Sequence, residues 1–310
     1  MKPQLLLLTF CVLMLAVSSQ GQQTTPPSQP TVRVSFSVTD ASGRAVNDLK
    51  VDDIQVFDEA SPVKVQSLSQ ETAPVMYGLL IDRSGSLKPH FSSLLDVAKQ
   101  VIAANGPSDQ TFLMSFVSSD KMEIMQEVTS DTAALNQALN LLKVEGGQTA
   151  LIDAVYVSAQ YAMKHQPATN YRVALVLLSD GEERASFYRE QQLMELLGRS
   201  KIQIFVVALV SDLDDESGLI RQSPRRKATD LAMRLAHGTG GDAFILKSSN
   251  ELTVGASLLT TELHSQYALG YTPTKKIDKN NRKVEIKLTK SPQHQKWRLV
   301  VGNVTTEAQK

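Results

Sequence analysis

The sequence of 310 residues contains a single cysteine, Cys11. It lies in an apolar block near the N-terminus, so the remainder of the chain has neither disulfides nor thiol chemistry. Without such crosslinks a protein depends on its hydrophobic core, and a chain of this length can form a sizeable one. Basic and acidic residues are balanced, 32 against 32. The overall charge therefore gives no indication of a nucleic-acid partner.

Several catalytic motifs are also missing. The sequence has no Gly-x-Ser-x-Gly elbow of a serine hydrolase and no Gly-x-x-x-x-Gly-Lys phosphate-binding loop. The histidines are scattered without the spacing of metal ligands; they are His90, His165, His237, His264 and His294. These absences argue against the enzyme classes that depend on such motifs.

The N-terminus has the pattern of a secretory signal. Lys2 precedes an apolar block of 13 residues, 5–17, and small and polar residues follow it. The block is short for a transmembrane helix, which needs about 20 residues. We therefore expect residues 1–22 to be a cleaved signal peptide, with an uncleaved anchor as the alternative. Residues 23–30 are expected to form a Pro-rich spacer. The mature protein would be secreted or periplasmic, without a stable membrane span.

Two segments that flank the centre of the chain alternate apolar and polar residues in the manner of β-strands. The first is residues 31–70, where Val32, Val34, Phe36 and Val38 stand at every second position. The second is residues 266–305. We expect the two segments to pair into one small β domain, with the central segment inserted between them.

The central segment, residues 74–265, alternates strands and helices. Its apolar runs are too continuous for a one-sided sheet and predict strands buried on both faces; they are residues 75–81, 111–117, 173–178 and 202–210. Residues 121–128 are typical of an edge strand and 242–246 of a last parallel strand. Helical periods separate most of these runs. The pattern predicts an α/β fold with a doubly wound, mainly parallel, Rossmann-like sheet.

Oxygen-bearing side chains follow two of the predicted strands and precede one of the predicted helices. Asp82, Ser84 and Ser86 stand in "DRSGS" after the first central strand, and Asp180 stands in "LLSDGEE" after another. Thr149 lies in the Gly-rich "EGGQTA" before a helix. In open parallel sheets ligands bind beyond the carboxyl ends of the strands. If these strands are neighbours, the five oxygen donors meet, and such a set suits a hard cation such as Mg²⁺ rather than zinc or copper.

These motifs, in this order and in these settings, resemble the metal-ion-dependent adhesion site (MIDAS) of von Willebrand factor type A (VWA) domains. The resemblance covers roughly residues 74–265. It implies that Ser84 and Ser86 bind the metal directly, that Asp82 and Asp180 bind it directly or through water, and that Thr149 joins when a partner is bound. A Glu or Asp of a protein partner would complete the octahedron. Arg83 occupies a position that the family pattern leaves variable.

The resemblance further implies a cation-dependent, adhesion-type binding module that is not an enzyme. Mg²⁺ is the expected cofactor, and Mn²⁺ and Ca²⁺ are the alternatives. The flanking segments, with "TDASGRAVNDLKVDDIQVFDE" and "YALGYTP", resemble an acidobacterial-type group of exported proteins that contain a VWA domain.

Two other functions remain open at this stage. One is a metal-dependent hydrolase or phosphatase with Asp82 as the nucleophile, although haloacid dehalogenase-like enzymes need a second Asp where this chain has Ser84. The other is a structural module without metal, in which Asp and Ser only cap helices.

A basic group close to the C-terminal end of another strand is a candidate for partner recognition. Arg221, Arg225 and Arg226 stand in "LIRQSPRRK", in the connection that follows the run 202–210. This places them at the same edge of the sheet as the proposed metal. We expect these arginines to help select the acidic partner. The alternative is that they form an ordinary basic segment exposed to solvent.

Overall fold

A computed structural model describes residues 31–167, 171–216, 222–273, 282–289 and 294–307. The predicted signal peptide, the spacer and Arg221 lie outside these residues. None of the helices that the structure describes is long and apolar enough to cross a bilayer.

The centre of the fold is a mixed, mostly parallel sheet of six strands. Its strand order is β10-β9-β8-β5-β6-β7. The strands are β5 (Val75–Asp82), β6 (Gln110–Phe116), β7 (Met122–Thr129), β8 (Arg172–Ser179), β9 (Gln203–Leu209) and β10 (Ala243–Leu246). Only the edge strand β7 runs antiparallel to its neighbour, β6. All eight residues of β5 are buried, as expected for a strand covered on both faces.

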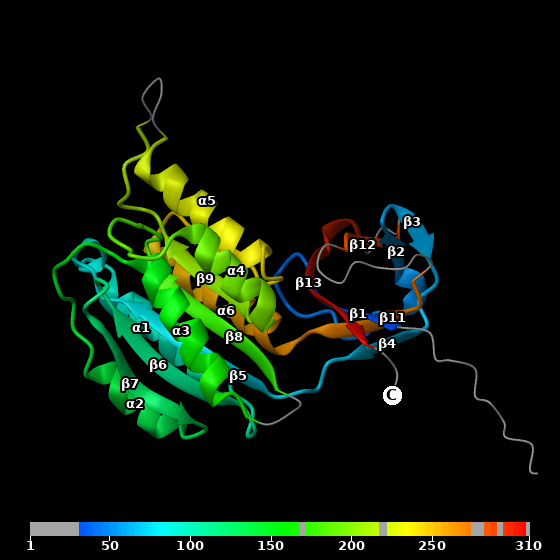
Figure 1. Ribbon diagram of the computed structural model, residues 1–310, viewed down its shortest axis with the longest axis horizontal. Helices are drawn as coiled ribbons and strands as arrows, with labels where there is room; N and C mark the ends of the chain where they lie inside the picture. Colours follow the sequence, from blue (N-terminus) through cyan, green and yellow to red (C-terminus); the bar gives the residue numbers. More distant parts are fainter. Residues whose placement is uncertain (1–30, 168–170, 217–221, 274–281, 290–293, 308–310) are drawn as a thin grey trace, which may run out of the picture.

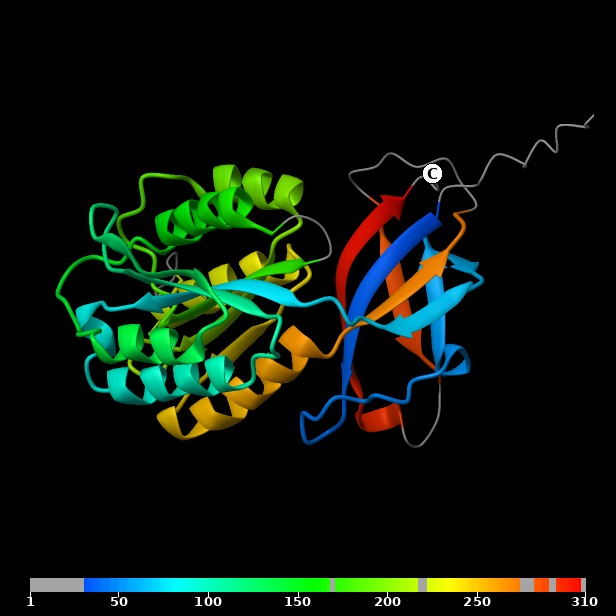
Figure 2. The same cartoon turned by 90° about the horizontal axis from the view of Figure 1, so that it is seen from below.

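Helices cover both faces of this sheet (Figures 1 and 2). On one face lie α1 (Phe91–Ala103), α2 (Thr132–Asn140) and α6 (Leu252–His264). On the other lie α3 (Leu151–His165), α4 (Glu190–Ser200) and α5 (Pro224–His237). Each helix packs an apolar stripe onto the strands, so the sheet is enclosed between two hydrophobic layers. The predicted doubly wound fold class is confirmed.

The N- and C-terminal segments form a small antiparallel β structure beside the sheet, which we call the β platform (Figure 2). One of its sheets has the order β13-β1-β11-β4 and the other β12-β2-β3. The strands are β1 (Thr31–Thr39), β2 (Ile54–Asp58), β3 (Ser61–Val63), β4 (Ser67–Gln70), β11 (Tyr267–Tyr271), β12 (Val284–Leu288) and β13 (Arg298–Glu307). Strand β1 pairs with both β11 and β13, which joins the two ends of the chain.

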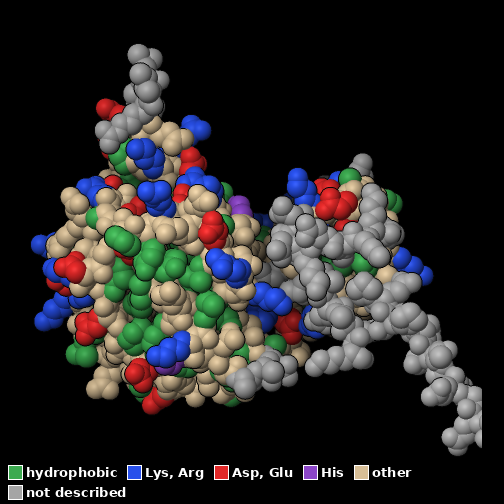
Figure 3. Space-filling model, in the orientation of Figure 1, with side chains coloured by type: hydrophobic (Ala, Val, Ile, Leu, Met, Phe, Trp, Pro, Cys, Tyr) green, Lys and Arg blue, Asp and Glu red, His purple; other side chains and the backbone are tan. Residues whose placement is uncertain are grey.

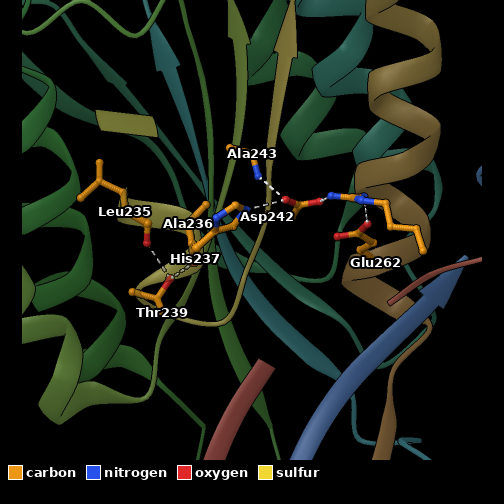
Figure 4. A network of polar contacts seen from close by, with 8 residues as sticks. Leu235, Ala236, His237, Thr239, Asp242, Ala243 and Glu262 are labelled. Atoms are coloured by element: carbon orange, nitrogen blue, oxygen red, sulfur yellow. Dashed lines mark hydrogen bonds and ion pairs between the residues drawn. The ribbon is translucent and has the colours of Figure 1, made fainter. Parts of the chain in front are cut away.

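One arginine of the β platform binds two buried carboxylates of the α/β domain, Asp242 and Glu262, both of which are labelled in Figure 4. The Arg298 guanidinium, at the start of β13, donates to Glu262 Oε1 on α6 at 2.6 Å and also pairs with Asp242, which precedes β10. The side chains of Asp242 and Glu262 are only 1% and 2% exposed. Asp242 also accepts the Ala243 N–H at 2.8 Å. Asp242 also contacts His237 Nε2 of α5 at 3.2 Å, whereas Arg298 is the one cation that contacts Glu262 among the described residues.

Burial raises the pKa of Glu262 to about 8. Its folded-state pKa therefore lies above that of the unfolded chain, and ionisation of this carboxyl opposes folding. Arg298 offsets that cost when the carboxyl is charged.

We expect Arg298→Met to lower the free energy of unfolding by about 2–3 kcal/mol, because buried Glu262 loses its cation and buried Asp242 loses the guanidinium. The loss should grow as the pH rises from about 7 to about 9, because Glu262 ionises in the folded protein around its pKa of about 8. Urea unfolding at both ends of this range measures the effect, with the exposed Arg226→Met as the control. A pH dependence equal to that of the wild type would contradict this role of Arg298.

Candidate functional site

The proposed metal-binding residues lie at the C-terminal edge of the central sheet. Strands β5 and β8 are parallel neighbours, with Ile81 opposite Leu178. Asp82 is the last residue of β5, and Asp180 follows directly after β8. The register therefore brings two carboxylates that are 98 residues apart in the sequence to adjacent positions.

Hydrogen bonds connect four of the five predicted ligands. The Ser86 hydroxyl donates to Asp180 Oδ2 at 2.5 Å, and the Ser84 and Ser86 hydroxyls lie 3.1 Å apart. Asp82 Oδ1 accepts the Ser84 N–H at 2.8 Å. Asp82, Ser84 and Asp180 are buried, whereas Ser86 is exposed. The group thus opens to solvent at Ser86.

Thr149, the fifth predicted ligand, is held beside the loop that follows β8. It is buried, and its carbonyl accepts the N–H groups of Arg184 at 2.9 Å and Ala185 at 3.2 Å. Among the described residues, no hydrogen bond joins its hydroxyl to the other four ligands. Thr149 therefore lies next to the site through its backbone, and a metal contact of its side chain stays a prediction.

Ser179 is a member of the site that the sequence analysis missed. Its hydroxyl donates to Asp82 Oδ2 at 2.6 Å and accepts the Gly181 N–H at 3.0 Å. Asp82 therefore has both carboxyl oxygens in hydrogen bonds, one to Ser84 and one to Ser179. The available signal was the position of Ser179 at the end of β8, directly before Asp180.

The site has an unbalanced negative charge. Burial, and after it the charge of Asp180, raises the pKa of Asp82 to about 7. Burial also raises the pKa of Asp180. Neither carboxylate forms a salt bridge with a lysine, arginine or histidine of the described residues. In the described part of the chain, two acids are thus removed from water side by side without a salt-bridge partner, which is costly when both are ionised.

The donors suit a hard divalent cation better than any other group. They are carboxylate and hydroxyl oxygens that open to solvent on one side, which is the chemistry of Mg²⁺, Mn²⁺ and Ca²⁺ sites. Among the described residues, no group of three or more His, Cys, Asp or Glu is placed to hold a metal. A cation at this edge of the sheet would therefore rely on serine hydroxyls as well as on the two aspartates.

Two further carboxylates fix the loop between β8 and α4. Glu183 Oε2 accepts the Ile152 N–H at the start of α3 at 2.8 Å, and Glu183 Oε1 accepts the Ser186 N–H at 2.9 Å. Asp153, which is buried, accepts the N–H groups of Phe187 and Tyr188, each at 2.8 Å. These contacts cap α3 and order the loop. Both acids stand close to predicted ligands in the sequence, but only the tertiary structure shows their role.

Arg83 connects the "DRSGS" turn to the loop that precedes Thr149. Its backbone N–H donates to Phe116 O at 2.9 Å, and its carbonyl accepts the Glu145 N–H at 2.8 Å. Its guanidinium lies 3.3 Å from the Glu145 carboxylate. The position that the family pattern leaves variable thus holds two loops of the site together in this chain.

The predicted recognition arginines differ in their surroundings. The Arg225 side chain donates to Val210 O at 3.2 Å, to Leu213 O at 2.8 Å and to Asp215 at 3.0 Å. It therefore holds the loop after β9 and has few donors left for a partner. The Arg226 side chain is 69% exposed. A role in partner selection stays a prediction for Arg226, and Arg221 lies outside the described residues.

A cavity of about 570 Å³ adjoins the site on the side of α5. Gly181, the residue directly after Asp180, is one of the residues that line this cavity. Its lining combines apolar and charged side chains, among them Ile152, Glu182, Lys227, Leu231 and Arg234. The C-terminal edge of the sheet is therefore hollowed next to Asp180.

Comparison with known proteins agrees with this description of the fold. Residues 78–183 match the family model of the von Willebrand factor type A domain, and the matched segment contains all five predicted ligands. The α/β domain thus has a VWA-type fold. No curated protein sequence matches the chain significantly. VWA domains generally mediate protein–protein interaction and are generally not enzymes.

Among solved structures, the chain is similar to an aerotolerance-related membrane protein from Bacteroides fragilis, with 16% identity, a TM-score of 0.47, and coverage of 61% of this chain and 98% of the other. A von Willebrand factor type A protein from Catenulispora acidiphila has 10% identity and a TM-score of 0.48, with coverage of 91% and 74%. Proximal thread matrix protein 1 of the mussel byssus, described with a zinc-occupied MIDAS motif, has 15% identity and a TM-score of 0.48, with coverage of 68% and 50%. The resemblance of the flanking segments to acidobacterial-type proteins stays a prediction.

We expect Asp180→Asn to leave the metal-free protein as stable as the wild type or more stable. The amide removes one of two neighbouring buried charges, and it can still accept from Glu182 N–H and donate to the Ser86 hydroxyl. Thermal unfolding in EDTA near neutral pH measures the effect. Breaking a stabilising buried network would lower the free energy of unfolding by more than about 2 kcal/mol. Such a loss would contradict the interpretation that the two neighbouring carboxylates destabilise the metal-free protein.

Proposed function

We propose that this protein binds an acidic side chain of a protein partner through a divalent cation, with Mg²⁺ as the expected metal and Mn²⁺ and Ca²⁺ as alternatives. Asp82, Ser84, Ser86, Thr149 and Asp180 would hold the cation. The cation, when bound, supplies a Lewis acid with a coordination position open to the partner's Glu or Asp.

The observation that carries this proposal is the pair of buried carboxylates that form no salt bridge with any residue that the structure describes. Asp82 and Asp180 are 0% and 3% exposed, and each contacts a serine at hydrogen-bonding distance. If the protein were a purely structural module, we would expect these two buried positions to hold either carboxylates paired with a cation or apolar side chains. A bound cation neutralises both acids and explains why hydroxyl oxygens surround them.

The surroundings of Asp82 favour binding over hydrolysis. A nucleophilic carboxylate must reach its substrate, but Asp82 is 0% exposed and its two oxygens accept from Ser84 N–H and Ser179 Oγ. Its place is behind the serines rather than at the surface. The group that reaches solvent is the Ser86 hydroxyl, which suits a metal ligand.

The proposed location is outside the cytoplasm, in the periplasm or beyond. This part of the proposal rests on the signal-like residues 1–22. An adhesion-type function fits such a location, because an exported partner would meet the metal face directly.

We expect Mg²⁺ or Mn²⁺ to raise the melting temperature of the protein, because a cation that binds only the folded state stabilises it. At a metal concentration about 100 times Kd, the gain is about 2.7 kcal/mol, or roughly 5–10 °C for a domain of this size. Differential scanning fluorimetry with EDTA as the reference measures the shift.

Ser86→Ala and Asp180→Ala should each remove most of this shift, and the exposed Ser92→Ala should retain it. A melting temperature that does not respond to millimolar Mg²⁺, Mn²⁺ or Ca²⁺ would favour the structural module without metal.

A further inference from the structure

Phe187, in the loop between β8 and α4, projects into solvent. Its side chain is 82% exposed, more than any other large hydrophobic residue that the structure describes. A single exposed apolar residue is common on protein surfaces. Phe187 is distinguished by the way in which the structure holds it and by its position.

The loop holds Phe187 rigidly. Asp153 accepts the backbone N–H of Phe187 and of Tyr188, each at 2.8 Å, and also accepts the Ser119 hydroxyl. The Phe187 ring lies edge-on to Tyr188 at 5.5 Å, and Tyr188 stacks on Tyr156 of α3 at 3.8 Å. The ring therefore stands on an ordered aromatic base, so little entropy is lost when a partner covers it.

The same loop touches the metal site. Ala185, two residues before Phe187, donates its N–H to the Thr149 carbonyl at 3.2 Å. Hydrophobic side chains also gather on the face of the α/β domain over which α3 and α4 run (Figure 3). Tyr156, Val157, Tyr161 and Tyr188 are among the partly buried residues of the hydrophobic layer that these helices form with the sheet. An apolar surface thus begins beside Thr149.

The charges around Phe187 fit an acidic partner. Arg184 and Arg189 are exposed on either side of it in the sequence, and Arg184 forms a salt bridge with Glu182 at 2.7 Å. The proposed metal and Arg189 would present positive charge near one apolar ring. Aromatic anchors with a charged rim are typical of the energetically dominant centre of a protein interface.

We propose that Phe187 is the apolar anchor of the partner-binding surface, and that the partner is an acidic peptide segment with an apolar residue within a few positions of its metal-binding Glu or Asp. The inference rests on the proposed function, which it deepens by giving the partner a second requirement. The cation selects the acid, and Phe187 selects its neighbour.

A library of random 12-residue peptides displayed on phage tests the inference. The library is selected on the full protein in Mg²⁺ and eluted with EDTA, and enriched peptides are then synthesised for measurement of Kd. The expected peptides contain Asp or Glu together with an apolar residue within about four positions. Phe187→Ser should weaken their binding about tenfold or more, and Phe187→Leu should retain most of it.

Met163→Ser is the matched control, because Met163 is an exposed apolar residue near the opposite end of α3. It should leave Kd unchanged. If Phe187→Ser binds as tightly as the wild type while EDTA still abolishes binding, the anchor is wrong and the proposed function stands. If no peptide is eluted by EDTA, both are wrong.

Discussion

The organisation of this protein depends on the adjacency of β5 and β8 in the central sheet. Because these strands are parallel neighbours, their C-terminal ends place Asp82 and Asp180 side by side. The helices on both faces then bury the pair. Ser84 and Ser86 follow in the turn after β5, and the Ser179 hydroxyl donates a hydrogen bond to Asp82 Oδ2. A local concentration of negative charge is thereby formed from segments that the chain separates widely.

The surrounding loops keep this arrangement in place. Arg83 ties the turn after β5 to the loop before Thr149, and Asp153 and Glu183 order the loop after β8. The β platform is joined to the α/β domain at the other end of the parallel strands, where Arg298 pairs with Asp242, directly before β10, and with Glu262 of α6.

Much of the fold could be predicted from the sequence because it depends on local patterns. Continuous apolar runs gave the buried strands, helical periods gave the covering layers, and two-residue alternation gave the β segments. The site residues Asp82, Ser84, Ser86 and Asp180 could be placed at strand ends by the same means. Their metal binding stays a prediction.

The contacts that support the site could not be predicted in this way. Asp153 and Glu183 bond to backbone groups more than thirty residues away, and Arg298 reaches Asp242 across 56 residues. Such pairings depend on how loops pass one another, which periodicity does not encode. The same holds for Arg225, whose bonds to the loop after β9 distinguish it from the neighbouring Arg226, and for the exposure of Phe187.

We propose above all that the side-chain oxygen atoms of Asp82, Ser84, Ser86, Thr149 and Asp180 hold one hard divalent cation. This cation would keep one coordination position open to solvent. Crystals of the protein soaked in Mn²⁺ and measured at the manganese absorption edge test it most directly. We expect one anomalous peak within about 2.0–2.6 Å of the Ser84 and Ser86 hydroxyls, the range of metal–oxygen bonds for such cations, and no peak in Asp180→Ala crystals. A fully soaked crystal with no peak beside Ser86, where lattice contacts leave that edge accessible, would contradict it.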